Sequence, residues 1–188
     1  MSAPGDVRTA TLDAAAHLLA TEGPRGFTVR GVAAAAGGST IAVYHYFSDK
    51  QGLIDAVYVE GHRRLRSAQE AQRFSDDPER DVRAACLAYR EIALAYPDYF
   101  LVMFGHGLDR FTTDVRATGR DNYGGFIEVM RRWNARAPLR VDPESAAYTL
   151  WSAGHGMVML ELTDNGPHED RSAQYDTLID TLMRGLTA

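Results

Sequence analysis

The chain has 188 residues, of which 45% are hydrophobic and 24% are charged, and its formal net charge is −5. This composition is typical of a globular protein that is long enough to bury a core, and it excludes a disordered chain. The negative net charge argues against a broadly basic polyanion binder, so the charge has to be followed along the chain.

The charge is unevenly distributed. The first 66 residues contain seven basic and six acidic side chains, whereas the remainder contains 13 basic and 19 acidic ones. Cys86 is the only cysteine, which argues against an intrachain disulfide and a cysteine-based zinc site. We find no signal-peptide pattern and no apolar run of about 18 residues, so we expect a cytoplasmic protein without a membrane partner.

Apolar side chains recur at helical spacing almost throughout, and the alternating β-branched runs that are typical of strands are missing. We therefore predict an all-α fold of about nine helices. In the first part of the chain, the pattern predicts helices over residues 6–22, 28–36, 40–47 and from 50 towards 72. Thr28 and Ser39 are the expected N-caps, and Gly23 with Pro24 ends the first helix.

The second part of the chain continues in helices that proline residues delimit. The expected segments are residues 79–96, 113–136, 143–162 and 170–185, and residues 99–104 form a dense aromatic and apolar stretch between the first two. Pro143 follows Asp142 at a helix start, where proline suits the first helical position.

Residues 28–47 are predicted to form two short helices joined by a tight turn that contains glycine, the layout of a helix-turn-helix. Val43 and Phe47 lie four residues apart and are expected to face the first of these helices. Short side chains on the opposite face would reach base edges in a major groove, and aromatic hydroxyls would donate to phosphates. Any helical hairpin shares this spacing, so the spacing alone leaves the function open.

The residue types are more specific than the spacing. The segment combines Thr28-x-Arg30, the turn Ala36-Gly37-x-Ser39, Tyr44-x-x-Phe47 and the following Lys50. Over about residues 8–60 this combination closely resembles the TetR family of one-component transcriptional regulators. The resemblance implies an all-α homodimer with an N-terminal DNA-binding domain and a larger helical domain for ligand binding and dimerisation. It assigns DNA contacts to Arg30, Thr40, Ile41, Ala42, Tyr44, His45, Tyr46 and Lys50.

Two positions depart from the family's pattern. Gly38 stands where a branched residue is usual, and Ile41 stands where glycine is common. An exposed Ile41 would contact a thymine methyl group, whereas the alternative is local packing against the protein. Both departures leave the base preference open.

The C-terminal half holds most of the large apolar side chains. Trp151, followed by His155-Gly156, resembles the Trp-His-Gly signature of one TetR C-terminal subfamily. Aromatic and methionine side chains line apolar ligand cavities, although each on its own is more often a core residue. We expect a small apolar or aromatic effector, with candidate ligand-binding residues Tyr99, Phe100, Met103, Phe104, Tyr123, Phe126, Met130, Trp151, His155 and Met159.

The predicted organisation is a helix-turn-helix DNA-binding domain at residues 6–52, a connecting helix at 53–75 and a ligand-binding and dimerisation domain at 76–186. The resemblance implies a homodimer through the last two helices, whose apolar stripe is Leu178, Ile179, Leu182, Met183 and Leu186.

No phosphate loop, nucleophile motif or zinc motif is present in the sequence, so we predict no enzyme activity, cofactor or metal. The predicted function is a ligand-responsive regulator, most simply a repressor, that binds a double-stranded palindromic operator. The alternative is a helical small-molecule-binding protein or enzyme without operator binding.

Overall fold

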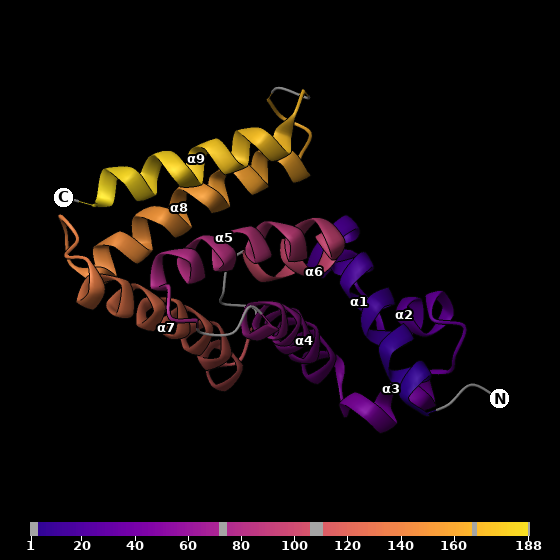
Figure 1. The fold of residues 1–188 in the computed structure, drawn as a ribbon. Coiled ribbons are helices and arrows are strands. Elements are labelled where there is room, and N and C mark those ends of the chain that lie inside the picture. The colour runs from indigo at the N-terminus through magenta and orange to yellow at the C-terminus, as the bar shows by residue number, and fades with distance from the viewer. Residues whose placement is uncertain (1–3, 72–74, 106–110, 167–168, 188) are drawn as a thin grey trace. The chain divides into compact units, whose positions relative to one another are not determined.

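The computed structural model describes residues 4–71, 75–105, 111–166 and 169–187, and over these ranges it contains nine helices and no β-strand (Figure 1). The predicted all-α class with an N-terminal helix-turn-helix is confirmed. An isolated antiparallel bridge joins Leu139 to Thr187. None of the helices in the described ranges has the length and apolar character that a membrane crossing requires.

The chain divides into two compact units. The N-terminal unit comprises residues 1–64 and 96–119, and the C-terminal unit comprises residues 65–95 and 120–188. These units are clusters of contacting residues, so the functional boundaries predicted near residues 52 and 75 stay predictions. The helices are α1 (Pro4–Gly26), α2 (Val29–Ala35), α3 (Thr40–Phe47), α4 (Lys50–Ala71), α5 (Pro78–Ala95), α6 (Pro97–Phe104), α7 (Thr113–Arg136), α8 (Pro143–Leu162) and α9 (Arg171–Leu186).

In the N-terminal unit, α1 packs against α2, α3 and α6. The regular part of α1 ends where it was predicted to end, because Gly23 adopts a left-handed backbone conformation with φ 66° and Pro24 follows it. The buried core of this unit includes Leu12, Leu19, Phe27, Val32 and Val57.

The short helices α2 and α3 begin at the predicted capping residues. The Thr28 hydroxyl accepts a hydrogen bond from the Gly31 amide at 3.0 Å, and the Ser39 hydroxyl accepts one from the Ala42 amide at 3.2 Å. Gly37 has φ 66°, so it ends the first of these helices in the left-handed region that glycine tolerates best. The turn between the two helices is therefore fixed at both ends.

The stretch 99–104, which the sequence indicated only as aromatic and apolar, lies in a helix of its own. Helix α6 starts at Pro97, at the first helical position, where a missing amide proton carries no penalty. Tyr99, Phe100 and Met103 are buried on this helix. The segment is helical because its apolar residues can pack against α1.

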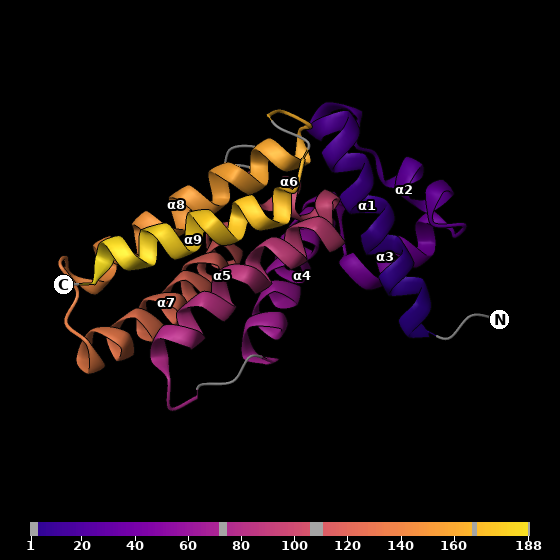
Figure 2. The same ribbon diagram turned by 45° about the horizontal axis from the view of Figure 1, so that its top comes forward.

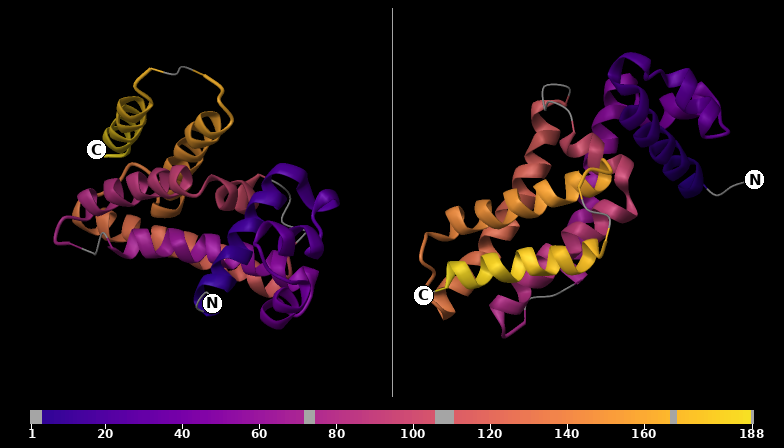
Figure 3. Two further views of the ribbon diagram at one scale, coloured as in Figure 1. Left: turned by 90° about the vertical axis from the view of Figure 1, so that its right-hand side faces the viewer. Right: turned by 90° about the horizontal axis from the view of Figure 1, so that it is seen from above.

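In the C-terminal unit, α5 packs on α8 and α9, and α8 and α9 run side by side in opposite directions (Figures 2 and 3). Trp133, Tyr175 and Leu150 belong to its core. Of the stripe predicted as the dimer face, Ile179, Met183 and Leu186 are buried inside their own chain, and the dimer through this helix stays a prediction. They are buried because α9 uses this face against the helices of its own unit.

Candidate nucleic-acid interface and ligand cavity

Helix α3 presents one face to the protein and the other to solvent. Val43 and Phe47 are buried, as the spacing predicted, and hold the helix against α1 and α2. The side chain of Ile41 is 80% exposed and that of Tyr44 is 51% exposed. The exposure of Ile41 contradicts the alternative of local packing and leaves this branched side chain available to a partner.

The remaining predicted DNA contacts on α3 surround this exposed face. His45 is exposed, whereas Thr40, Ala42 and Tyr46 are half-buried. The His45 and Tyr46 rings meet edge to face with 5.2 Å between their centroids. The face thus offers short side chains at its start and polar aromatic groups further along, the combination that reads a groove and contacts its phosphates.

Two cations flank α3. Arg30 is exposed on α2, and Lys50 is exposed at the first residue of α4. The Lys50 ammonium lies 5.5 Å from the centroid of the Phe27 ring and 3.5 Å from the Pro24 carbonyl oxygen, and it has no ion pair to a carboxylate among the described residues. Because Lys50 also sits at a helix N-terminus, its surroundings favour an anion.

The angle between α3 and α4 depends on Gly52. Asp49 caps α4, since its carboxylate accepts a hydrogen bond from the Gly52 amide at 2.7 Å. A Cβ atom added at Gly52 would overlap the carbonyl oxygen of Phe47, the last residue of α3. Only glycine fits this close approach, which explains the glycine that follows Lys50-Gln51 in the sequence.

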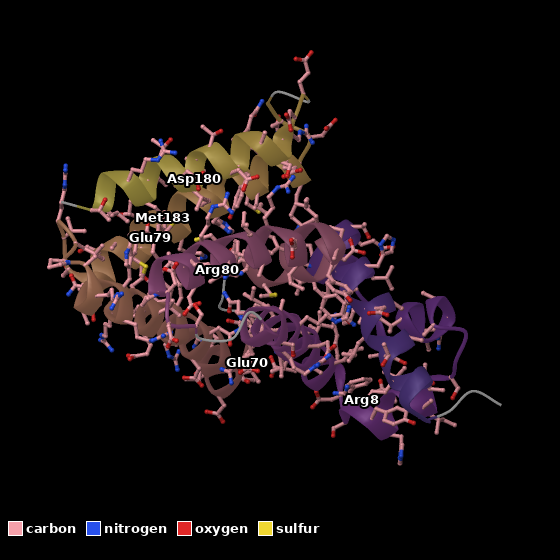
Figure 4. All side chains as sticks on the ribbon, in the orientation of Figure 1. Arg8, Glu70, Glu79, Arg80, Asp180 and Met183 are labelled. Atoms are coloured by element: carbon pink, nitrogen blue, oxygen red, sulfur yellow. The ribbon has the colours of Figure 1, made fainter. Side chains whose placement is uncertain are left out.

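Arg8 is an exposed cation that the sequence analysis did not select. It projects from the start of α1 (Figure 4), and its guanidinium carbon lies 5.6 Å from the centroid of the Phe47 ring on α3. Its position next to α3 depends on the packing of α1 against α3, which a reading of the helix-turn-helix segment alone does not show.

Arg64 of α4 contacts residues of α1 and of the start of α6. Its guanidinium lies 4.3 Å from the ring centroids of both Tyr96 and Tyr99, and it forms ion pairs with Glu60 at 2.9 Å and Asp13 at 3.0 Å. Hydrogen bonds from Arg63 and from Arg64 hold the pKa of Glu60 at about 2, so it stays ionised. The network fixes α4 relative to α1 and α6.

The ten predicted ligand-binding residues are divided between the two units. Tyr99, Phe100, Met103 and Phe104 belong to the N-terminal unit, and the other six belong to the C-terminal unit. The Tyr99 hydroxyl donates to the Asp13 carboxylate at 2.9 Å. In this structure the α6 residues act as packing residues of their own unit, and their role in ligand binding stays a prediction.

The Trp-His-Gly signature on α8 has a structural explanation. Trp151 Nε1 donates to the Tyr89 hydroxyl of α5 at 3.2 Å, and that hydroxyl is 2.9 Å from His155 Nδ1. Trp151 and His155 are four residues apart, so both reach the same hydroxyl from one face of α8. Burial lowers the pKa of His155, which favours its neutral form. The signature therefore attaches α8 to α5.

The two glycines near this signature differ. A Cβ atom added at Gly154 would lie 2.9 Å from the Tyr175 hydroxyl, so this glycine allows α9 to approach α8. A Cβ atom added at Gly156 would meet nothing within 4 Å, and Gly156 is exposed together with Tyr148 and Leu160 on α8. None of the described residues therefore requires glycine at position 156.

The C-terminal unit contains a cavity of about 400 Å³. Of the predicted ligand-binding residues, Phe126 lines it; Met130 is fully buried and Met159 half-buried elsewhere, and Tyr123 packs on Trp151. The other lining residues were not predicted from the sequence, because charged and amide side chains on helices usually occupy surface positions. They are Arg66, Gln69 and Glu70 of α4, Asp81 and Ala85 of α5, and Asp121, Asn122, Gly125 and Val129 of α7.

Two family models match this chain. One, described as "Tetracyclin repressor-like, C-terminal domain", covers residues 82–185, which is more than half of the chain. The other, described as "Bacterial regulatory proteins, tetR family", covers residues 12–57 and includes α2, α3 and Lys50. No curated protein matches the chain.

Solved structures share the whole fold. A protein of unknown function from Rhodococcus sp. RHA1 is 25% identical with a TM-score of 0.77, and 97% of this chain and 96% of that chain are covered. PfmR from Thermus thermophilus, a TetR family regulator, is 23% identical with a TM-score of 0.78 and coverage of 95% and 99%. A TetR family transcription regulator from Marinobacter aquaeolei is 18% identical with a TM-score of 0.80 and coverage of 97% and 96%.

Proposed function

Because this chain belongs to the TetR family of DNA-binding transcriptional regulators, we propose that it is a ligand-responsive repressor that binds a palindromic operator as a cytoplasmic homodimer. The observation that carries the proposal is the exposed face of α3. Val43 and Phe47 hold the helix from behind, while Ile41, Tyr44 and His45 are left to solvent.

In this proposal, Thr40, Ile41 and Ala42 read base edges, while Tyr44 and Lys50 contact phosphates. The exposed Ile41 would lie against a thymine methyl group, which gives a preference for a T·A pair at one position. The N-terminal part carries almost no excess of positive charge, so few phosphate contacts are expected. Affinity then depends on two recognition helices that bind half-sites about one helical turn apart.

The proposed dimer forms through α8 and α9. Support comes from the exposed side of α8, where Tyr148 is 61% and Leu160 is 53% exposed. Gly156 lies on the same helix without an intrachain reason to be glycine, so a close approach by a partner helix would explain it. On α9, only the half-buried Leu178 and Leu182 of the predicted stripe remain available.

We propose the cavity of the C-terminal unit as the effector site. Its volume of about 400 Å³ suits a small organic molecule. An effector that binds this cavity more tightly when the recognition helices are wrongly spaced would release the operator. The effect is limited by the difference between the effector's affinities for the two states.

The test starts from the full chain. A DNA site is selected from a random duplex pool, and its affinity is then measured by fluorescence anisotropy for Tyr44→Ala and Lys50→Ala. Each variant is expected to bind about 10- to 100-fold more weakly, because a hydrogen bond to a charged phosphate contributes about 1.5–3 kcal/mol. Lys50→Ala should also lower the slope of affinity against salt concentration by about one unit.

Arg136→Ala is the matched control. It also removes one exposed cation, but from the last turn of α7 in the C-terminal unit, so we expect operator affinity close to that of the unchanged protein. Selection of a palindromic site supports the dimer, whereas an absence of any selected site, or equal affinities for all three variants, contradicts the proposal.

A further inference from the structure

The walls of the cavity differ in chemistry. Ala85, Phe126 and Val129 are the apolar residues of the lining. The same lining contains three carboxylates and one guanidinium, that of Arg66. The sequence predicts only an apolar or aromatic effector. The charges in the lining also indicate which charge the ligand should carry.

Two of the charged groups are already engaged. The Asp81 carboxylate accepts hydrogen bonds from Ser75 and forms an ion pair with Arg132 at 3.0 Å. Burial opposes its ionisation, but these hydrogen bonds outweigh burial and hold the pKa of Asp81 below its ordinary value. Arg66 donates from Nε to the Asn122 side-chain oxygen at 2.9 Å, which fixes the guanidinium beside α7.

The other two carboxylates are those of Glu70 and Asp121. Both are exposed, and neither has an ion pair among the described residues. Glu70 projects from the last turn of α4 (Figure 4), where the helix dipole also places partial negative charge. With Asp81 neutralised by Arg132, the lining retains an excess of one negative charge.

We infer that the cavity takes an organic cation with an apolar body, such as a hydrophobic amine. The body packs against Ala85 and Val129, the positive group is attracted by Glu70 and Asp121, and Phe126 adds an aromatic ring within the same lining. An anion would pair with Arg66 only in the presence of two unneutralised carboxylates. A neutral molecule would gain nothing from these charges.

The inference rests on the proposed role of the cavity as effector site, but it is tested by direct binding. We would titrate the full chain by calorimetry with three probes that share a phenyl ring and an alkyl chain: 4-phenylbutylamine, 4-phenylbutan-1-ol and 4-phenylbutyrate. The amine is expected to bind at least fivefold more tightly than the alcohol, and the butyrate most weakly. Equal binding of the three, tighter binding of the butyrate, or no binding of the amine would overturn the inference.

Charge removal tests the assignment of the carboxylates. Glu70→Gln and Asp121→Asn keep the side-chain shape and are expected to weaken amine binding about two- to fivefold each, because exposed charges interact weakly in water. The affinity for 4-phenylbutan-1-ol should stay the same. An amine affinity that neither variant changes would overturn the role of these carboxylates.

Two adjacent glycines provide a further control. A Cβ atom added at either Gly124 or Gly125 would meet nothing within 4 Å, but only Gly125 lines the cavity. Gly125→Leu is expected to fill the cavity and abolish amine binding. Gly124→Leu should retain it, and both variants should fold because leucine favours a helix more than glycine does. Amine binding that survives Gly125→Leu unchanged would place the ligand elsewhere and overturn the inference.

The outcome separates this inference from the proposed function. If the alcohol or butyrate binds best and Gly125→Leu abolishes that binding, the cavity is a ligand site but the cationic class is wrong. If the amine binds as expected but no DNA site is selected, the cationic class holds and the repressor proposal fails.

Discussion

Helices α3 and α8 each carry a family signature, but the signature on α3 is exposed, whereas that on α8 is engaged within its own unit. On α3, Ile41 and Tyr44 are exposed and contribute little to the packing of the chain. On α8, Trp151 and His155 both reach the hydroxyl of Tyr89 and attach the helix to α5. The difference shows that a recurrent set of residues indicates a partner only when the fold leaves it exposed.

The glycines show the same contrast. Gly52 and Gly154 lie where a side chain would collide with a neighbouring group, so they are structural requirements. A Cβ atom added at Gly125 or Gly156 would meet no neighbouring atom within 4 Å. We have proposed a ligand as the neighbour of Gly125 and a second subunit as the neighbour of Gly156. Substitutions at Gly52 and Gly154 should therefore change stability, whereas substitutions at Gly125 and Gly156 should change ligand binding and dimerisation, respectively.

The largest effect is expected for Gly52→Ala. The added Cβ atom would overlap the Phe47 carbonyl oxygen, so α3 has to shift relative to α4. We expect a loss of about 1–3 kcal/mol in the free energy of unfolding, as for other overpacked sites. We also expect a loss of more than tenfold in operator affinity, because the recognition helix is displaced. Urea denaturation and fluorescence anisotropy measure the two quantities.

Gly38→Ala is the control within the same motif. An added Cβ atom there meets only the Ala33 carbonyl oxygen, at 4.0 Å, so the substitution should leave stability unchanged or raise it slightly. Equal stabilities of the Gly52→Ala and Gly38→Ala variants would show that the α3–α4 turn tolerates a side chain.

Tyr89→Phe is expected to have an intermediate effect. It removes the hydroxyl that Trp151 and His155 share, which should lower the free energy of unfolding by about 1–3 kcal/mol. Tyr44→Phe removes an exposed hydroxyl and should change stability by less than about 0.5 kcal/mol, while operator affinity falls. If Tyr44→Phe lowered stability more than Tyr89→Phe, the α3 signature would contribute to packing and the α8 signature would not, which contradicts the contrast between the two helices.

The smallest expected effect is a loss of stability at acidic pH that is linked to His155. Burial lowers the pKa of His155 in the folded chain, whereas the unfolded chain keeps a pKa of about 6.5. Below that value the unfolded state binds more protons, so the contribution of neutral His155 is complete above pH 6.5 and decreases as the pH falls. Urea denaturation at pH 7.5 and 5.5 should show a smaller acid loss for His155→Gln. Equal losses of stability in the variant and the unchanged protein would mean that protonation of His155 is not linked to unfolding.

The local features of the fold could be predicted from the sequence. Thr28 and Ser39 cap α2 and α3 because a hydroxyl needs only the amide three residues along the chain. The alternation of buried Val43 and Phe47 with exposed Tyr44 follows from helical spacing. Helix α6 was missed as a helix, although Pro97 before an apolar run was a usable signal.

The proposed ligand cavity could not be predicted in the same way. Arg66, Asp81 and Asn122 come from three helices, and only the packing of α4, α5 and α7 brings them to one lining. On each helix alone, a charged or amide residue indicates a surface position. Of the aromatic residues selected instead, Tyr99 and Phe100 are buried in the core of their unit, because ring size favours burial whether or not a ligand is present, and Phe126 lines the cavity.

Lys50, the chain's single lysine, has a practical consequence for chemistry in solution. Its exposed amine is the one side-chain group in the protein that acylating reagents modify readily. Treatment of the intact protein with such a reagent should therefore label one side chain, Lys50, in addition to the amino terminus. Mass spectrometry would measure the rate at which Lys50 is acylated. Operator DNA that covers the start of α4 should lower this rate, so DNA binding could be followed without an engineered label.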